Sequence, residues 1–358
     1  MNEAELKELA RAHGYVRMGL CAPEPFERWR AASACAHKTA RHLHADPLED
    51  VPWARALCVL AAPYPMYKPV GGVSVCAYYV AYNAAHARMQ ALLNALGERG
   101  VRAQEARIPL KPAALRARLG AYGRNGLIRL EGLGSCVMLG CVALGEGFEA
   151  ECTDAHDDLA ACAAGESPYA HEACISDSNA QCKRGQSRGV SLPQDRHICG
   201  SCRRCMDACP TGALSERGLD HARCLRSHML QGPPVPDELR RAMGGRLLGC
   251  EECLRACPRN AGAVGAALDA PDELRRVLDI SRALDERTRA DYMRDFGALL
   301  GWNMAIPNRV LAQAVLVAAN LGMHELAPLI APLAKSNSAA VKEHTIWALE
   351  RLEGINNV

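Results

Sequence analysis

Residues 198–214 read ICGSCRRCMDACPTGAL, and residues 249–260 read GCEECLRACPRN. The first stretch holds four cysteines spaced C-x₂-C-x₂-C-x₃-C, and the second holds three spaced C-x₂-C-x₃-C. A proline follows the last cysteine of each run, Cys209 and Cys257, and one more cysteine, Cys224, lies between the runs. Together they offer eight thiolates, the number that two four-iron clusters require. This pair of runs dictates how the middle of the chain must fold.

The spacing also predicts which cysteines share a cluster. In the bacterial two-cluster ferredoxin pattern, the fourth cysteine of such a run binds the other cluster. The first cysteine set is therefore Cys199, Cys202, Cys205 and Cys257, and the second cysteine set is Cys209, Cys224, Cys250 and Cys253. Each Cys-Pro step ends a ligand loop, because proline fixes φ and donates no backbone hydrogen bond.

Two simpler explanations of these cysteines are a zinc site and a disulfide framework. A four-thiolate zinc site is built from paired C-x₂₋₄-C elements and does not need the longer run or its partial repeat. Disulfide frameworks are typical of small, loop-rich secreted chains, whereas this chain has 358 residues. Two iron–sulfur clusters explain the pattern better than either alternative.

The composition is that of an ordinary water-soluble chain of two or three domains. Hydrophobic residues make up 49% of it, and the formal net charge is +2. The interval 183–246 is locally basic, with 12 Lys and Arg against 6 Asp and Glu, which suits a phosphate backbone as well as a solvated surface. The N-terminus lacks signal-peptide features, and no stretch of about 18 apolar residues occurs, so we expect a cytoplasmic protein without a membrane span.

Hydrophobic periodicity predicts a mixed α+β chain that becomes purely helical toward its C-terminus. The expected strands are 15–21, 53–63, 101–104, 127–130 and 135–144. The expected helices are 2–13, 76–98, 110–119, 272–278, 284–300, 307–320, 324–334 and 339–353. Stacked helices without any β pattern read as a fragment of an α-solenoid.

The interval 146–196 breaks this pattern, because it has few large apolar residues. It contains two histidines and four cysteines whose spacing fits no metal-site template: His156, His171, Cys152, Cys162, Cys174 and Cys182. A third metal site and an insertion with free thiols both remain open for this interval.

Three stretches, in this order along the chain, resemble the epoxyqueuosine reductase family. The segment IPLKPAALRARLGAYGRNGL at 108–127 resembles the glycine-rich stretch that this family shares with reductive dehalogenases. The two cysteine runs resemble its double cluster, and VKEHTIWALERL at 341–352 resembles the HEAT-type repeat at its C-terminus. A looser likeness covers LCVLAAPYP at 57–65 and SVCAYYVAYN at 74–83.

The resemblance implies a fold and its domains. It implies a nitroreductase-like, cobalamin-binding α/β domain over 1–145 and an insertion over 146–196. A bacterial-ferredoxin-type domain with two 4Fe-4S clusters would follow over 197–262, and a helical HEAT-like tail over 263–358. The residues that it implies for cobalamin are Gly120, Tyr122, Gly123, Asn125 and Gly126.

The resemblance also implies an activity. An external low-potential donor would reduce the clusters, these would reduce cobalamin, and epoxyqueuosine in a tRNA anticodon stem-loop would become queuosine. We expect the protein to act as a monomer, with the basic surface and the helical tail holding the RNA.

Departures from the family pattern leave other functions open. Gln104 takes the position of the family's proton-donating Asp, and an amide is not a general acid; Glu105 takes the role if the register shifts by one residue. The family's Ser-Arg-Tyr-Ala…Asp-Tyr-His stretch is here SVCA at 74–77 and AYN at 81–83. The alternatives are a corrinoid and iron–sulfur reductase of a different, non-tRNA substrate, and a two-cluster electron-transfer protein without catalysis.

Overall fold

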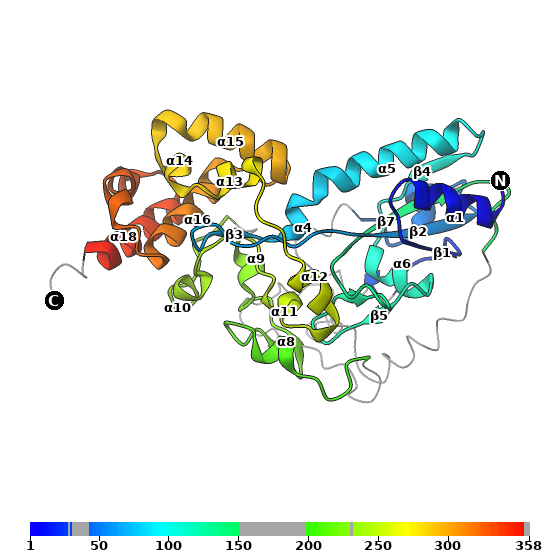
Figure 1. Ribbon diagram of the computed structural model, residues 1–358, viewed down its shortest axis with the longest axis horizontal. Helices are drawn as coiled ribbons and strands as arrows, with labels where there is room; N and C mark the ends of the chain where they lie inside the picture. The colour runs from blue at the N-terminus through cyan, green and yellow to red at the C-terminus, as the bar shows by residue number, and fades with distance from the viewer. Residues whose placement is uncertain (28, 31–42, 151–197, 230–231, 354–358) are drawn as a thin grey trace, which may run out of the picture.

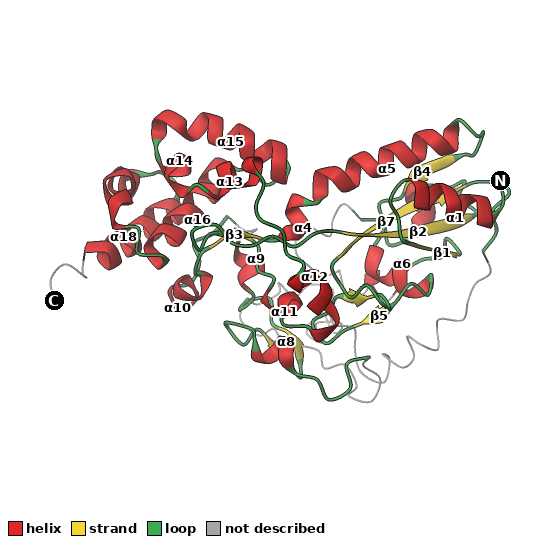
Figure 2. Ribbon diagram, viewed as in Figure 1, coloured by secondary structure: helices red, strands yellow, loops and turns green. Residues whose placement is uncertain are grey.

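The structure is a computed structural model that describes residues 1–27, 29–30, 43–150, 198–229 and 232–353. Figure 1 shows the N-terminus at the end of the molecule that holds the sheet and the C-terminus at the opposite, helical end. Figure 2 shows strands concentrated in the first half of the chain and helices alone in the last quarter. The cysteine runs lie between these two ends.

The strands are β1 (Arg17–Cys21), β2 (Ala56–Pro63), β3 (Ser74–Val75), β4 (Ala103–Glu105), β5 (Ala121–Tyr122), β6 (Ile128–Arg129), β7 (Val137–Leu144), β8 (Leu214–Ser215), β9 (Gly218–Leu219) and β10 (Arg246–Leu248). The helices before the second cysteine run are α1 (Glu3–Ala12), α3 (Pro47–Asp50), α4 (Ala77–Val80), α5 (Tyr82–Gly97), α6 (Leu110–Arg116), α8 (Arg204–Asp207), α9 (Leu225–Met229), α10 (Asp237–Arg240) and the 3₁₀ turn η4 (Arg241–Met243).

The second run and the tail contain α11 (Glu252–Arg255), η5 (Pro258–Asn260), α12 (Ala261–Gly265), α13 (Asp272–Leu278), α14 (Ile280–Leu284), α15 (Glu286–Leu300), α16 (Pro307–Asn320), η6 (His324–Leu326), α17 (Ala327–Ile330), η7 (Ala331–Lys335) and α18 (Ala339–Glu353). None of the helices in the described intervals has the length and apolar character needed to cross a bilayer.

A four-stranded antiparallel sheet forms the centre of the N-terminal half, in the order β1-β2-β7-β4. Strand β2 is buried along almost its whole length, because both faces of the sheet are covered. Helices α1 and α5 pack on one face, where Leu60 belongs to their core. Helix α6 and strand β6 pack on the other face, together with Val59. The continuous apolar run of β2 is thus explained by burial on two sides.

The tail helices form one core that also takes in residues from earlier in the chain. Helices α14, α15, α16 and α18 pack around buried side chains such as Tyr292 and Val315. The same core contains Val75 and Tyr79 from the first half, and Leu247 just before the second cysteine run. Strands β3 and β10 pair in parallel and join these distant segments. The core therefore extends across the boundaries predicted at 145 and 262, which stay predictions.

The predicted α+β class and the helical C-terminus are confirmed. Helices 272–278, 307–320 and 339–353 have the predicted bounds. The predicted helix 324–334 is instead one α-helical turn between two 3₁₀ segments, since Pro328 and Pro332 each lack a backbone donor. Strands β3 and β10 were not predicted, because two or three residues paired across the chain leave no periodic signal.

Candidate iron–sulfur site

The two cysteine runs fold alike. In the first run a turn closes from the Cys202 N–H to the Cys199 carbonyl at 3.1 Å, and the short helix α8 then carries Cys205. In the second run the short helix α11 carries Cys253, and Pro258 opens the 3₁₀ turn η5. Helices α8 and α11 pack against each other. Two loops rich in thiols are therefore brought face to face.

The first cysteine set is brought together around one small pocket. Cys199, Cys202, Cys205 and Cys257 all line it, so the last cysteine of the second run does lie among three cysteines of the first. Burial first, and then the neighbouring thiols of Cys199 and Cys257, raise the pKa of Cys205 to about 11. Thiolates at such a place need a compensating cation, which bound iron supplies. The residues fit a four-iron cluster, although their role as ligands stays a prediction.

The second cysteine set gathers around Cys253. Burial first, and then the thiols of Cys250 and Cys224, raise the pKa of Cys253 to about 12. Cys205 and Cys209 lie close enough to add to this effect. Cys205 and Cys209 also pack with Cys253 in one small apolar cluster that includes Met206 and Leu214. The two sets are thus neighbours, and apolar side chains fill the space beside them.

Cys209 differs from the other thiols in its hydrogen bonding. Burial alone would raise its pKa, but the backbone N–H groups of Thr211 and Leu214 outweigh this effect and lower it. The Thr211 hydroxyl lies 3.8 Å from the Cys209 sulfur. Donors around a sulfur stabilise its negative charge and tune the potential of an attached cluster.

Across the described intervals, no three His, Cys, Asp or Glu side chains are placed to hold one metal ion together. Four thiolates of a zinc site converge on a single ion, whereas those of a four-iron cluster bind the cluster as a whole. The four cysteines around the first pocket are the number that one four-iron cluster binds. The cysteines and histidines between 152 and 182, for which a third metal site was left open, lie outside the described residues.

The glycine-rich loop predicted to bind cobalamin forms the hairpin between β5 and β6. Gly120 approaches this hairpin so closely that a Cβ would lie 2.2 Å from the Arg129 carbonyl oxygen. Gly126 has a φ of 69°, which favours glycine, and its carbonyl accepts a hydrogen bond from Lys111 Nζ at 2.7 Å. Local structure therefore accounts for these two glycines without a ligand.

The same loop packs against both cysteine runs. A Cβ at Gly123 would lie 3.7 Å from the Cys199 sulfur. The Asn125 amide donates to the Cys253 carbonyl at 3.4 Å, and its oxygen accepts from the Leu127 N–H at 3.3 Å. Tyr122 is half-buried against the α6 side of the sheet. Gly123 and Asn125 thus lie beside the cysteines, and the role of all five predicted residues in binding cobalamin stays a prediction.

Glu105, predicted as a proton donor, lies apart from this loop. It ends β4 and stands opposite Val142 of β7, so both side chains point to the face covered by α1 and α5. There it acts electrostatically on Tyr15, whose pKa is raised to about 12, mainly by burial. The cysteine pocket adjoins the hairpin on the opposite face. This geometry gives the predicted role of Glu105 no support.

Sequence reasoning missed the polar residues of the cysteine pocket. Arg124, Arg129 and Ser135 line it together with the thiols. Arg129 donates to the Ile198 carbonyl at 3.0 Å, beside the first cysteine. The Ser135 N–H donates to Asn260 at 2.7 Å, which ties β7 to the end of the second run. No spacing in the sequence identifies such residues, because tertiary packing alone brings them to the thiols.

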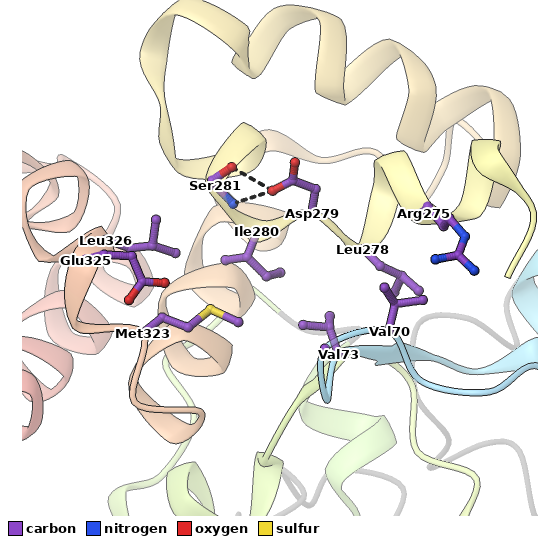
Figure 3. Close-up of a pocket in the computed structure, with 11 residues that line it drawn as sticks. Val70, Val73, Arg275, Leu278, Asp279, Ile280, Ser281, Met323, Glu325 and Leu326 are labelled. Atoms are coloured by element: carbon purple, nitrogen blue, oxygen red, sulfur yellow. Dashed lines mark hydrogen bonds between the residues drawn. The ribbon is translucent and has the colours of Figure 1, made fainter.

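A larger pocket of about 440 Å³ lies elsewhere, between the 70–73 turn and the tail helices (Figure 3). It shares no lining residue with the cysteine pocket. Asp279 is engaged in capping α14, through the Ser281 N–H at 3.1 Å and hydroxyl at 2.6 Å. Arg275 donates to the Ala270 carbonyl at 2.8 Å. With these polar groups already used, the pocket offers little chemistry.

Comparisons with known proteins agree with this site. Residues 198–260 match the family described as "4Fe-4S double cluster binding domain". This chain is 47% identical to an epoxyqueuosine reductase from Bacillus subtilis (strain 168) over 66 residues, which is 18% of this chain and 17% of that protein. It is 31% identical to one from Xanthomonas campestris over 176 residues, or 45% and 46% of the two chains. The matches to the first relatives thus span only about a fifth of their length.

Solved structures extend the similarity to nearly the whole chain. An epoxyqueuosine reductase from Streptococcus thermophilus superposes with a TM-score of 0.69 at 19% identity, over all of this chain and 93% of that one. An epoxyqueuosine reductase with an epoxyqueuosine-modified tRNA-Tyr stem loop gives 0.68 at 19% identity, over 98% and 90% of the chains. The resemblance to this family is confirmed, as a shared fold with partial sequence matches, and so is the double-cluster domain.

Proposed function

We propose that this relative of the epoxyqueuosine reductases is an iron–sulfur oxidoreductase that acts on a modified nucleoside, epoxyqueuosine, in a tRNA anticodon loop. One observation carries the proposal: two neighbouring sets of four cysteines, linked by the crossing of Cys257, in a chain with this family's fold throughout. The double-cluster match supports the redox part. The choice of substrate is based on the relatives' names and on the aromatic surface described below.

The clusters, when bound, supply one-electron transfer from an external donor. The chain places Cys205 and Cys253, one from each set, in the same apolar cluster. Met206 and Leu214 pack beside them and are nearly inaccessible to solvent. Exclusion of water from this contact protects the thiolates and lowers the cost of moving an electron between the sets.

Cobalamin enters the proposal through the family resemblance. The loop predicted for it has the structural roles given above, so the residues on their own do not define a corrinoid site. We derive no step through this cofactor. Uptake of cobalamin by the purified, iron-loaded protein, followed by its absorption spectrum, is the direct measurement.

An exposed aromatic surface supports an RNA partner. We call Tyr82, Trp302, Ile306 and Arg309 the aromatic surface; the side chains of the first three are 44%, 67% and 42% exposed. Tyr82 at the start of α5 lies against the α15–α16 connection, with its ring 3.9 Å from the Cβ position of Gly301. Asn83 donates to the Ala298 carbonyl at 2.5 Å and holds the two elements together. Aromatic rings beside cations are typical of sites that bind unpaired bases.

Arg309 lies in the first turn of α16, three residues after Ile306. It lies close enough to Tyr79 for the two to interact electrostatically. Its Nε is buried and has no hydrogen-bond partner among the described residues.

The activity is tested by reconstituting iron anaerobically and adding cobalamin, a low-potential donor and an epoxyqueuosine-containing anticodon stem-loop. Conversion to queuosine, measured by mass spectrometry of the nucleosides, is expected. The Cys257→Ser variant should lose conversion, while the exposed Leu268→Ala variant should keep it. Iron-loaded protein that binds cobalamin but leaves this RNA unchanged would contradict the substrate.

A second candidate is a reductase of the same chemistry that acts on a different, non-tRNA substrate. Gln104 replaces the family's acid, and Glu105 lies on the far face of the sheet, so neither supplies a proton at the loop. Binding of the stem-loop separates the candidates, because electrostatic RNA binding weakens steeply as salt rises. RNA affinity that does not depend on salt would favour the second candidate.

A further inference from the structure

Arg124 is a deeply buried charged side chain that lines the cysteine pocket; only 9% of it is exposed. It lies in the hairpin loop, between Gly123 and Asn125. Its Nη1 forms an ion pair with Glu216 at 2.6 Å, and its Nη2 donates to the Gly200 carbonyl at 2.8 Å. Gly200 follows Cys199 directly, so the side chain spans the hairpin and the first cysteine run.

The third guanidinium nitrogen, Nε, takes no part in these contacts. Arg124 Nε is buried and has no hydrogen-bond partner among the described residues. A buried N–H without an acceptor destabilises a protein, so such a donor is expected to have a partner. The pocket that Arg124 lines is bounded by four thiols, and the loop backbone at Gly123 already lies close to the Cys199 sulfur.

We propose that Arg124 Nε donates a hydrogen bond to a sulfur of the cluster held by the first cysteine set. The inference rests on the proposed iron–sulfur function. Glu216 and Gly200 hold the two terminal nitrogens, which fixes the guanidinium plane and leaves Nε for the sulfur. A four-iron cluster with its thiolates is negatively charged, and reduction adds to that charge. A cation with an aimed N–H therefore stabilises the reduced form and raises the potential of this cluster alone.

Glu216 offsets part of the positive charge of Arg124. It accepts from Arg203, which lies between Cys202 and Cys205, as well as from Arg124. Arg203 also pairs with Asp207 at 3.9 Å, so the network contains two cations and two carboxylates beside the first cysteine set.

The test is a redox titration of iron-loaded Arg124→Met followed by electron paramagnetic resonance. Methionine keeps most of the volume and removes the charge and all donors. The cluster in question is the one whose signal disappears in Cys199→Ser. Its potential is expected to shift to more negative values, with the other cluster unchanged. The control is Arg240→Met, since Arg240 is 11% exposed and its Nε already donates to the Val235 carbonyl at 2.9 Å.

An unchanged potential in an Arg124→Met protein that retains all its iron overturns the proposal. If that variant loses iron, Arg124→Lys decides, because it keeps a charge but places no donor at the Nε position. Its potential must then lie below that of the unmodified protein, and equal potentials also overturn the proposal. Failure of the unmodified protein to hold iron would be a failure of the proposed function instead.

Discussion

At the scale of single residues, the cysteines were predictable and their surroundings were not. The C-x₂-C-x₂-C-x₃-C-P spacing alone placed Cys257 with the first run, and the structure brings it into that pocket. Arg124 and Ser135 gave no signal, because their proximity to the thiols depends on a hairpin that is distant in sequence. Glu105 was predicted as the proton donor only because a one-residue shift in register would align it with the family's Asp. Alternation along β4 points its side chain to the face of the sheet opposite the cysteine pocket.

The crossing of the cysteines makes a prediction at this scale. Cys209→Ser and Cys224→Ser should each damage the same cluster, while Cys199→Ser damages the other. Electron paramagnetic resonance of the reduced variants distinguishes the two signals. The assignment fails if Cys209→Ser and Cys199→Ser remove the same signal.

Gly120 makes a prediction about stability. Gly120→Ala would place a Cβ 2.2 Å from the Arg129 carbonyl oxygen, so the hairpin must shift at a cost of about 1–3 kcal/mol. Gly97 at the end of α5 is the matched control, because nothing lies within 4 Å of its Cβ position. Denaturant unfolding of both variants measures the difference. Equal stability of the two would show that the hairpin is not packed as described.

At the scale of elements, long periodic segments were predictable and short, nonlocal ones were not. Helix α16 has the predicted bounds, because Pro307 opens it and a nearly continuous apolar run over 310–319 follows, all of it buried. Strands β3 and β10 depend on pairing across more than 150 positions and carry no local pattern. The helical pattern also did not indicate that a buried histidine at the contact between α16 and α18 joins three segments of the chain.

His344 on α18 is that residue. Its Nε2 accepts from the Val235 N–H at 2.9 Å, and its Nδ1 donates to the Ala312 carbonyl at 3.0 Å. Burial lowers its pKa from 6.5 to about 4, so the folded state holds it neutral. Its stabilising contribution is therefore complete above pH 6.5 and decreases as the pH falls from 6.5 toward 4.

Between pH 6.5 and 5.5 this loss amounts to about 1 kcal/mol of unfolding free energy, because the unfolded side chain is already half protonated at pH 6.5. Gln at this position keeps an acceptor and a donor but does not titrate. His344→Gln should therefore lose less stability than the unmodified protein over this interval, measured by denaturant unfolding at each pH. Parallel losses in both proteins would refute the role of His344.

The aromatic surface makes a prediction at the same scale. Trp302→Ala should weaken binding of an anticodon stem-loop by about 5- to 150-fold, since stacking on one base contributes about 1–3 kcal/mol. Leu268→Ala changes another exposed apolar residue, 51% exposed against 67% for Trp302, outside this surface and should leave affinity unchanged. Fluorescence anisotropy with labelled RNA measures both. Equal affinities would place the RNA elsewhere.

At the scale of the whole molecule, the mixed α+β fold with a helical tail was predictable, and the division of the chain into domains stays a prediction. The tail core includes Val75 and Tyr79 from the first half of the chain, so the sheet end and the helical end are joined through β3, β10 and α4. The cysteine runs occupy the middle, in contact with the hairpin of the sheet end. If RNA binds at the aromatic surface, as proposed, it contacts elements continuous with the core behind the second cysteine run.

The central claim, that the chain holds two four-iron clusters, is tested most directly by counting iron and acid-labile sulfide in anaerobically reconstituted protein. The account predicts about eight of each per chain, and about four of each in the Cys257→Ser variant. One tightly bound zinc ion per chain without sulfide, or a full complement of iron in Cys257→Ser, would contradict it.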